Sequence, residues 1–303
     1  MDPIISQIQA LKQEKNAVIL AHYYVPEEVQ AVADYIGDSY HLSKLATTID
    51  AQTLVLCGVR FMGESAKILN PGKTVLLPDA NADCPMAHMA QISAIQSVRA
   101  QYGSEVAVVC YINSTAALKC HADVCVTSSN AQKIVAALPQ PYIYFIPDEN
   151  LGRYIASQLP EKQFIFNQGH CPIHVRITAQ DVRAQKALHP DAPVLVHPEC
   201  LPEVVALADY VGSTSGIINF ATASNAQAFI VCTEVGVCYE LRQKNPQKRF
   251  FPARQDQVCA DMKRITLQKV YDALCTNTPG VALDATVREA AHAPLLRMLS
   301  LSK

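Results

Sequence analysis

The stretch AHYYVPEEVQAVADYIGDS, residues 21–39, decides the fold because its pattern recurs twice further along the chain. The two other copies are CYINSTAALKCHADVCVTSS (residues 110–129) and VHPECLPEVVALADYVGSTS (residues 196–215). In each copy an aspartate and a hydroxyl residue follow an aromatic anchor by 12 and 17 residues; the anchors are His22, Tyr111 and His197. The anchors lie 89 and then 86 residues apart, a length suited to a small α/β domain. Such self-similarity is typical of a repeated structural unit.

The repeat predicts three domains. With 303 residues, of which 50% are hydrophobic and 17% charged, the chain can bury a large core. We expect the first unit, with an N-terminal helix, over residues 1–103, the second over 104–189, and the third with a helical tail over 190–303. Within the tail, the amphipathic segment 287–299 is expected to pack back across the first unit.

Each unit alternates short apolar runs with helical segments. In the first unit the apolar runs include NAVILAHYY, TLVLCGV and TVLLPD, at residues 16–24, 53–59 and 74–79. Runs of this kind are typical of parallel strands that are covered on both faces by helices. The predicted fold class is therefore α/β, with three homologous three-layer domains arranged about a pseudo-threefold axis and an active site at the centre.

Ligands bind at the carboxyl ends of parallel strands, and the repeat places nine polar side chains there. They are His22, Tyr24, Ser39, Tyr111, Asn113, Ser128, His197, Glu199 and Thr214. Glu199 is the one carboxylate among them and so the acid/base candidate, with Tyr24 as a second proton-transfer group. The three hydroxyl residues are expected to cap helices whose N-termini could together bind a phosphate or carboxylates. The repeated aspartates, Asp34, Asp123 and Asp209, are expected to be structural.

One cysteine also recurs in all three units. Cys84, Cys171 and Cys259 lie 62, 60 and 62 residues after their anchors. Three thiolates about one axis suit a metal centre better than disulfides, because an odd set cannot pair. Their softness and the vacant fourth position favour a 4Fe-4S cluster with one open iron, while zinc stays open as the alternative. The other cysteines are expected to be structural.

The composition and net charge limit the classes of molecule that the chain is expected to bind. The net charge of −2 gives no basic surface for nucleic acid, and no apolar run is long enough to span a membrane. The chain start shows no signal peptide, and eleven cysteines, an odd number, favour a reducing compartment. A cytoplasmic enzyme that acts on small molecules is the expectation, with no nucleic acid or membrane partner.

These residues resemble a known family, the quinolinate synthases of bacterial NAD biosynthesis. The resemblance rests on the segments already quoted and on FMGESAKILNPGKTVLLPDANADCPMA, FIPDENLG and CADMK. It implies condensation of iminoaspartate with dihydroxyacetone phosphate to give quinolinate, phosphate and water, at a 4Fe-4S cluster. It also implies supply by an aspartate-oxidising enzyme.

The resemblance also assigns site residues. The cluster ligands would be Cys84, Cys171 and Cys259, and the acid/base groups His22, Tyr24 and Glu199. The substrate contacts would be His22, Ser39, Tyr111, Ile112, Asn113, Ser128, His174, His197, Pro198, Glu199 and Thr214. Two positions depart from the family pattern: Asp256 replaces the first cysteine of a C-x-x-C pair, and Tyr239 replaces a histidine.

Two other functions stay open beside the synthase. One is a zinc-dependent hydrolase or lyase on the same three-repeat fold, and the other is a non-catalytic iron–sulfur sensor that binds a partner. Metal analysis separates the first alternative from the synthase, and the lack of a basic face or recognition motif weakens the second.

Overall fold

A computed structural model describes residues 3–302 as an α/β structure with twelve strands in three sheets. The strands are β1 (Ala17–His22), β2 (Tyr35–Gly37), β3 (Thr53–Cys57), β4 (Thr74–Leu76), β5 (Val106–Tyr111), β6 (Val124–Val126), β7 (Tyr142–Ile146), β8 (Gln163–Phe166), β9 (Val194–Val196), β10 (Tyr210–Val211), β11 (Ala228–Cys232) and β12 (Arg249–Pro252).

Helices connect the strands throughout. The α-helices are α1 (Pro3–Glu14), α2 (Glu27–Val32), α3 (Ser39–Ala46), α4 (Arg60–Leu69), α5 (Ile92–Tyr102), α6 (Ala116–Lys119), α7 (Ala131–Ala136), α8 (Glu149–Gln158), α9 (Ala179–Leu188), α10 (Pro202–Val205), α11 (Thr214–Ala223), α12 (Val237–Lys244), α13 (Leu267–Thr276) and α14 (Ala285–Leu301). The short 3-10 helices are η1 (Pro85–His88), η2 (Gly103–Glu105), η3 (His174–Arg176) and η4 (Met262–Arg264). Among residues 3–302, no helix combines the length and hydropathy needed to cross a membrane.

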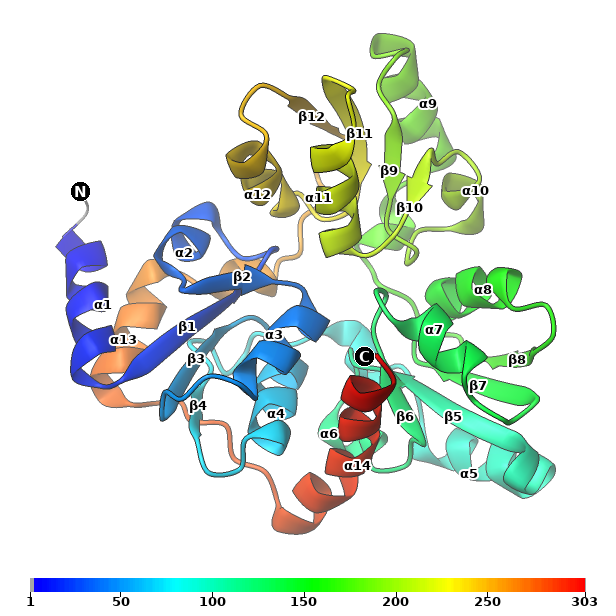
Figure 1. The fold of residues 1–303 in the computed structure, drawn as a ribbon, viewed down its shortest axis with the longest axis horizontal. Helices are drawn as coiled ribbons and strands as arrows, with labels where there is room; N and C mark the ends of the chain where they lie inside the picture. The colour runs from blue at the N-terminus through cyan, green and yellow to red at the C-terminus, as the bar shows by residue number, and fades with distance from the viewer. Residues whose placement is uncertain (1–2, 303) are drawn as a thin grey trace.

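The three sheets have the same topology. Their strand orders are β2-β1-β3-β4, β6-β5-β7-β8 and β10-β9-β11-β12, and every pair of neighbours is parallel. Figure 1 shows the sheets as three lobes around a common centre. The predicted α/β fold with three equivalent parallel sheets is confirmed, and its order places the first strand of each unit inside its sheet, beside the second.

The repeated aspartates pin the second strand to the first, as expected of structural residues. A carboxylate oxygen of Asp34 accepts the N–H of Ile19 at 2.8 Å, and the N–H of Asp34 donates to the Ile19 carbonyl at 3.0 Å. Asp123 exchanges the same pair of bonds with Val108, and Asp209 does so with Val194. Each carboxylate therefore satisfies a backbone N–H just before the strand pairing begins.

Three lysines form a second repeated contact that the sequence analysis missed. Lys73, Lys162 and Lys248 each lie 51 residues after their unit's anchor. Their ammonium groups donate to backbone carbonyls at the ends of α3, α7 and α11, for example from Lys162 to Leu138 at 2.6 Å. Helix C-terminal carbonyls lack intrahelical partners and carry partial negative charge, so a cation there stabilises the helix end.

The units differ in how they are joined. A single cluster of buried apolar side chains runs through the first two units and the C-terminal tail, whereas the sheet of the third unit packs in two separate clusters, one of which includes Tyr23 of the first unit. Helix α13 returns from the third unit to pack on α1 and β3 of the first. Helix α14 then lies between the first two lobes, against α4 on one side and β6 and α6 on the other. The segment 287–299 thus contacts the second unit as well as the first.

The capping prediction for the three repeated hydroxyl residues is wrong. Ser39 and Thr214 are the first residues of α3 and α11, whose caps are the side chains of Asp38 and Ser213. Ser128 lies in the turn before α7, where Asn130 takes the cap position. The Asp38 and Ser213 side chains accept helix N–H groups of α3 and α11, whereas the Asn130 side chain makes no cap hydrogen bond in α7, so none of the three predicted hydroxyls caps a helix.

Candidate functional site

The three units enclose a cavity of about 290 Å³ at their meeting point. The predicted site residues that line it are His22, Tyr24, Ser39, Cys84, Tyr111, Asn113, Ser128, Cys171, His174, His197, Glu199, Thr214 and Cys259. They follow the carboxyl ends of the first and second strands of the sheets or belong to the loops after the fourth strands. Apart from His174, which only the resemblance assigned, the sequence spacing therefore predicted which side chains line the cavity, although they lie up to 237 residues apart.

Ile112 and Pro198 are absent from the cavity lining. Each lies between two lining residues, and in extended chain successive side chains point to opposite sides. The Ile112 side chain is fully buried, and its backbone N–H donates to the Val126 carbonyl at 2.8 Å. A substrate contact at either residue stays a prediction and would involve the backbone.

The three cysteines occupy turns of one design. Each precedes a short 3-10 helix, namely η1, η3 and η4. Against the effect of burial, backbone N–H groups two and three residues ahead act to lower the pKa of each thiol; these pairs are Met86 and Ala87, Ile173 and His174, and Asp261 and Met262. Two convergent N–H groups favour negative charge on sulfur, so these turns suit thiolate ligands.

Without a bound metal, burial disfavours the negative charge on these sulfurs. It raises the pKa of Cys259 to about 11 and the pKa of Cys84 and Cys171 further, and the sulfurs repel one another when charged. A bound metal deprotonates its thiol ligands outright. The donor set, three soft sulfurs that line one cavity, therefore fits a metal–sulfur group that supplies the missing positive charge.

A tighter set of donors overlaps this trio. Among residues 3–302, the ligand atoms of Cys171, His174 and Glu199 lie within 4.8 Å of one another, which is close enough for a single metal ion. Cys84 and Cys259 belong to no such compact set in that range. The structure thus contains two sets of donor atoms that could hold a metal, and the two sets share Cys171.

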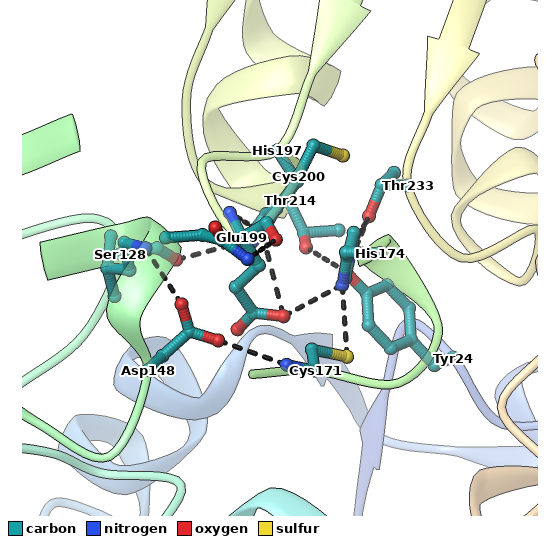
Figure 2. Close-up of polar contacts among 12 residues, drawn as sticks. Tyr24, Ser128, Asp148, Cys171, His174, His197, Glu199, Cys200, Thr214 and Thr233 are labelled. Atoms are coloured by element: carbon teal, nitrogen blue, oxygen red, sulfur yellow. Dashed lines mark hydrogen bonds and ion pairs between the residues drawn. The ribbon is translucent and has the colours of Figure 1, made fainter. Parts of the chain in front are cut away.

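Glu199 is the centre of the polar contacts in the cavity (Figure 2). One carboxylate oxygen accepts the Tyr111 hydroxyl at 2.5 Å, and the other lies 2.8 Å from Nδ1 of His174 and 3.9 Å from Nδ1 of His197. Burial acts to raise the pKa of Glu199, but the charge and hydrogen bonds of His174, together with His197 and Tyr111, hold it below the usual range. The carboxylate is therefore ionised and oriented from both sides.

Two histidines and two tyrosines near Glu199 are held in their neutral forms. Burial lowers the pKa of His22 and of His197 to about 3, although the charge of Glu199 acts in the opposite direction. Burial, reinforced by the same carboxylate, raises the pKa of Tyr24 and Tyr111 well above 10. At neutral pH the site thus combines the ionised Glu199 with the neutral imidazoles of His22 and His197 and the protonated phenols of Tyr24 and Tyr111.

Three functional candidates escaped the sequence analysis because they break the repeat. Thr233 lies 36 residues after its anchor, where the other units have Gly58 and Pro147. At the next position Asp148 and Glu234 are fully buried carboxylates, whereas the first unit has a valine. These carboxylates accept the backbone N–H of Cys171 and Cys259, each at 3.1 Å. The signal that could have found them is a polar residue one or two positions after the end of a third strand.

The position of the missing C-x-x-C cysteine carries an ion-pair network instead. Asp256 accepts hydrogen bonds from Arg254 at 2.8 Å and from Arg176, which also lines the cavity. All eleven cysteines of the described chain have free thiols. The loop that presents Cys259 is therefore connected to the second unit by charge rather than by a covalent bond.

Comparison with known proteins identifies relatives over nearly the whole chain. The family model described as Quinolinate synthetase A protein matches residues 6–300. A protein of Caldicellulosiruptor saccharolyticus named quinolinate synthase is 46% identical over 302 residues, which cover 100% of this chain and 99% of the relative. Proteins of the same name from Clostridioides difficile and Aquifex aeolicus are 48% and 46% identical, over 98% of this chain and 97% and 93% of theirs.

Proposed function

The chain belongs to the Quinolinate synthetase A protein family, and on that premise we propose that it makes quinolinate for NAD biosynthesis. The proposed reaction condenses iminoaspartate with dihydroxyacetone phosphate and releases phosphate and water. The observation that supports it most directly is the set of three equivalent cysteine turns around the cavity that also contains Glu199. An aspartate-oxidising enzyme is the proposed source of the unstable imine.

We propose that Cys84, Cys171 and Cys259 hold one 4Fe-4S cluster per chain. The open iron of such a cluster supplies a Lewis acid that assists loss of water from a hydroxyl-bearing carbon. The protein supplies the thiolates, their N–H donors, and a cavity in which the ligand turns come from three different units. Cytoplasmic location stays part of the same proposal, since such clusters need a reducing environment.

The remaining lining residues account for proton transfer and binding. Glu199, ionised and held by Tyr111 and His174, is positioned to accept a proton from a carbon or hydroxyl of a bound substrate. Tyr24, protonated and 2.9 Å from Thr214, is positioned to donate one. Neutral His22 and the hydroxyls of Ser39 and Ser128 offer hydrogen bonds to phosphate or carboxylate oxygens.

A second candidate function is a zinc-dependent hydrolase or lyase. The compact set of Cys171, His174 and Glu199 supports it, because three protein ligands and an open position are the usual catalytic zinc site. In that arrangement Cys84 and Cys259 would bind no metal.

Metal analysis after anaerobic reconstitution, combined with a quinolinate assay, separates the two functions. The proposed synthase contains four irons and four sulfides per chain, and Cys84→Ala removes both the iron and quinolinate formation. The zinc enzyme contains one zinc, and Cys84→Ala leaves that zinc in place. Cys238→Ala, a buried cysteine of α12 outside the trio, is the matched control and is expected to retain metal and activity.

A further inference from the structure

The mouth of the central cavity is marked by the lining residues that are exposed to solvent. In the described part of the chain these are Pro85, Arg176 and Ala260. All three lie in or next to the short 3-10 turns that follow the predicted cysteine ligands. The cavity therefore meets solvent at the cysteine turns, and Arg176 is the charged side chain among the three exposed residues.

The charges that line the cavity are unequal in number. Among the lining residues of the described chain, Arg176 is the only lysine or arginine. The carboxylates that line it are Asp38, Asp83, Glu199, Glu234 and Asp261. Both substrates of the proposed reaction are anions, one a phosphate ester and the other a dicarboxylate. An anion that enters the cavity therefore meets the like charge of Glu199 inside and a single guanidinium at the mouth.

An ion pair between two units holds Arg176 at the mouth. Its guanidinium donates to Oδ2 of Asp256, which belongs to the third unit. About half of each side chain is exposed, 52% for Arg176 and 50% for Asp256. An ion pair with this exposure contributes little stability, because water screens the charges and two long side chains must be ordered. An anionic ligand with several charged oxygens can therefore replace Asp256 on the guanidinium.

Asp256 does not depend on Arg176 for its position. Arg254 donates to both of its oxygens, from Nε to Oδ1 at 2.8 Å and from an Nη atom to Oδ2 at 3.2 Å. The arginine at the same place in the third unit's turn, Arg264, pairs with the buried carboxylate of Asp79 and does not line the cavity. That pair joins two units through a buried partner, whereas the pair of Arg176 is exposed and lies on the cavity wall.

We propose that Arg176 is a substrate-binding residue, whose guanidinium takes a phosphate or carboxylate group of an incoming substrate in exchange for Asp256. This inference rests on the proposed function, which supplies the two anionic substrates. A guanidinium presents its N–H groups in a planar fork that matches an oxyanion, so it binds two oxygens at once. Its positive charge at the mouth also raises the rate at which anions enter the cavity.

Calorimetric titration of the cluster-loaded protein measures this binding without turnover. The ligands are dihydroxyacetone phosphate and, in a separate titration, succinate, a stable dicarboxylate that replaces the unstable imine. Arg176→Gln is expected to raise the Kd of at least one ligand about 10- to 100-fold, because charge-assisted hydrogen bonds are lost. Arg176→Lys keeps the charge but not the fork, so its Kd should lie between those of the parent and the glutamine variant.

Arg153→Gln is the matched control. Arg153 also belongs to the second unit, is 51% exposed and pairs with a carboxylate, that of Glu149, but it does not line the central cavity. Its variant should bind both ligands with a Kd within about twofold of the parent, since distant exposed charges are screened. Melting temperature and iron content check that each variant is folded and loaded. Unchanged Kd values in Arg176→Gln, or equal losses in the two glutamine variants, would overturn the proposal.

Asp256→Asn tests the exchange of partners. Without the competing carboxylate the guanidinium is free, so the Kd of the affected ligand is expected to fall, by up to about fivefold. A higher Kd would show that Asp256 holds Arg176 in place for the ligand, and the exchange would be wrong. In turnover, Arg176→Gln should raise the KM of the substrate that carries the affected group and leave kcat within about threefold of the parent.

The proposal and the proposed function fail in different ways. If the parent forms no quinolinate, the function is wrong, and the titrations still decide whether Arg176 binds oxyanions. If the parent forms quinolinate and Arg176→Gln binds both ligands as the parent does, the function stands and the binding role of Arg176 is wrong.

Discussion

The cysteine turns and the polar chain around Glu199 line one cavity but differ in symmetry: the turns are equivalent in the three units, whereas the polar chain is not. The turns are alike in all three units: each cysteine precedes a short 3-10 helix, and backbone N–H groups two and three residues ahead act to lower its pKa. The chain uses residues that differ between units: at the position two after the anchor the three units have Tyr24, Asn113 and Glu199. Symmetry suits a ligand that needs three equal donors, whereas acid/base chemistry needs unequal groups whose pKa values lie apart.

The largest effect is expected where the units are alike. Cys84→Ala, Cys171→Ala and Cys259→Ala should each remove the cluster and reduce quinolinate formation to background. Removing two of the three should cost no more than removing one, because groups that act as a unit are not additive. Iron and sulfide content and the quinolinate assay measure this. If any one of the three variants kept a full cluster, the three cysteines would not be equivalent cluster ligands.

Substitutions in the polar chain around Glu199 should lower kcat strongly, but by different amounts for different residues. Glu199→Gln keeps the shape but loses the ionised acceptor, and kcat should fall by about 10²- to 10⁴-fold. Tyr24→Phe should lower kcat less, because Thr214 and Thr233 remain. Both variants should retain full iron content, which distinguishes them from the cysteine variants. If either variant lost iron together with activity, the polar chain would also be needed for cluster binding, and its separation from the cysteine turns would be wrong.

The repeated aspartates should affect stability but not chemistry. Asp34→Ala, Asp123→Ala and Asp209→Ala each leave a backbone N–H of the neighbouring strand without its carboxylate, which costs about 1–3 kcal/mol in the free energy of unfolding. Asp34 and Asp123 also pair with Lys12 and Arg99, so their variants should lose more. Urea unfolding measures the loss, and kcat of the folded variants should match the parent.

Acid should destabilise the protein partly through two buried histidines. The folded pKa of His22 and His197 is lowered to about 3 by burial, whereas the unfolded value is near 6.5. Below pH 6.5 the unfolded chain therefore binds protons that the folded chain does not, and stability is lost as pH falls toward 3. Each histidine contributes a slope of up to about 1.4 kcal/mol per pH unit.

Replacing one of these histidines tests that account. His197→Asn should flatten the dependence of the free energy of unfolding on pH between 6.5 and 3, measured by urea unfolding at a series of pH values. An unchanged slope in the variant would show that His197 is not the group that resists protonation.

The threefold sequence repeat explains how much of the site could be predicted from the sequence. Three copies of one pattern made the anchors and the cysteine trio visible, and the strand ends then placed them together. Thr233, Asp148 and Glu234 were missed because the comparison of units discards residues that occur in one or two of them. The helix caps were mispredicted for a local reason: Asp38 and Ser213 can cap as well as the residues that follow them.

The sequence by itself determined the three α/β units, the parallel sheets and the residues at their strand ends, because strand periodicity and spacing are local properties that three copies report independently. Only the tertiary structure decided which hydroxyls cap helices, that α14 joins the first two units, and how His174 contacts Thr233, Glu199 and Cys171. The contacts of α14, and those of His174 with Thr233 and Glu199, join residues from different units, so their geometry depends on packing that no short stretch of sequence specifies; the caps are local, but two neighbouring residues could each have provided them.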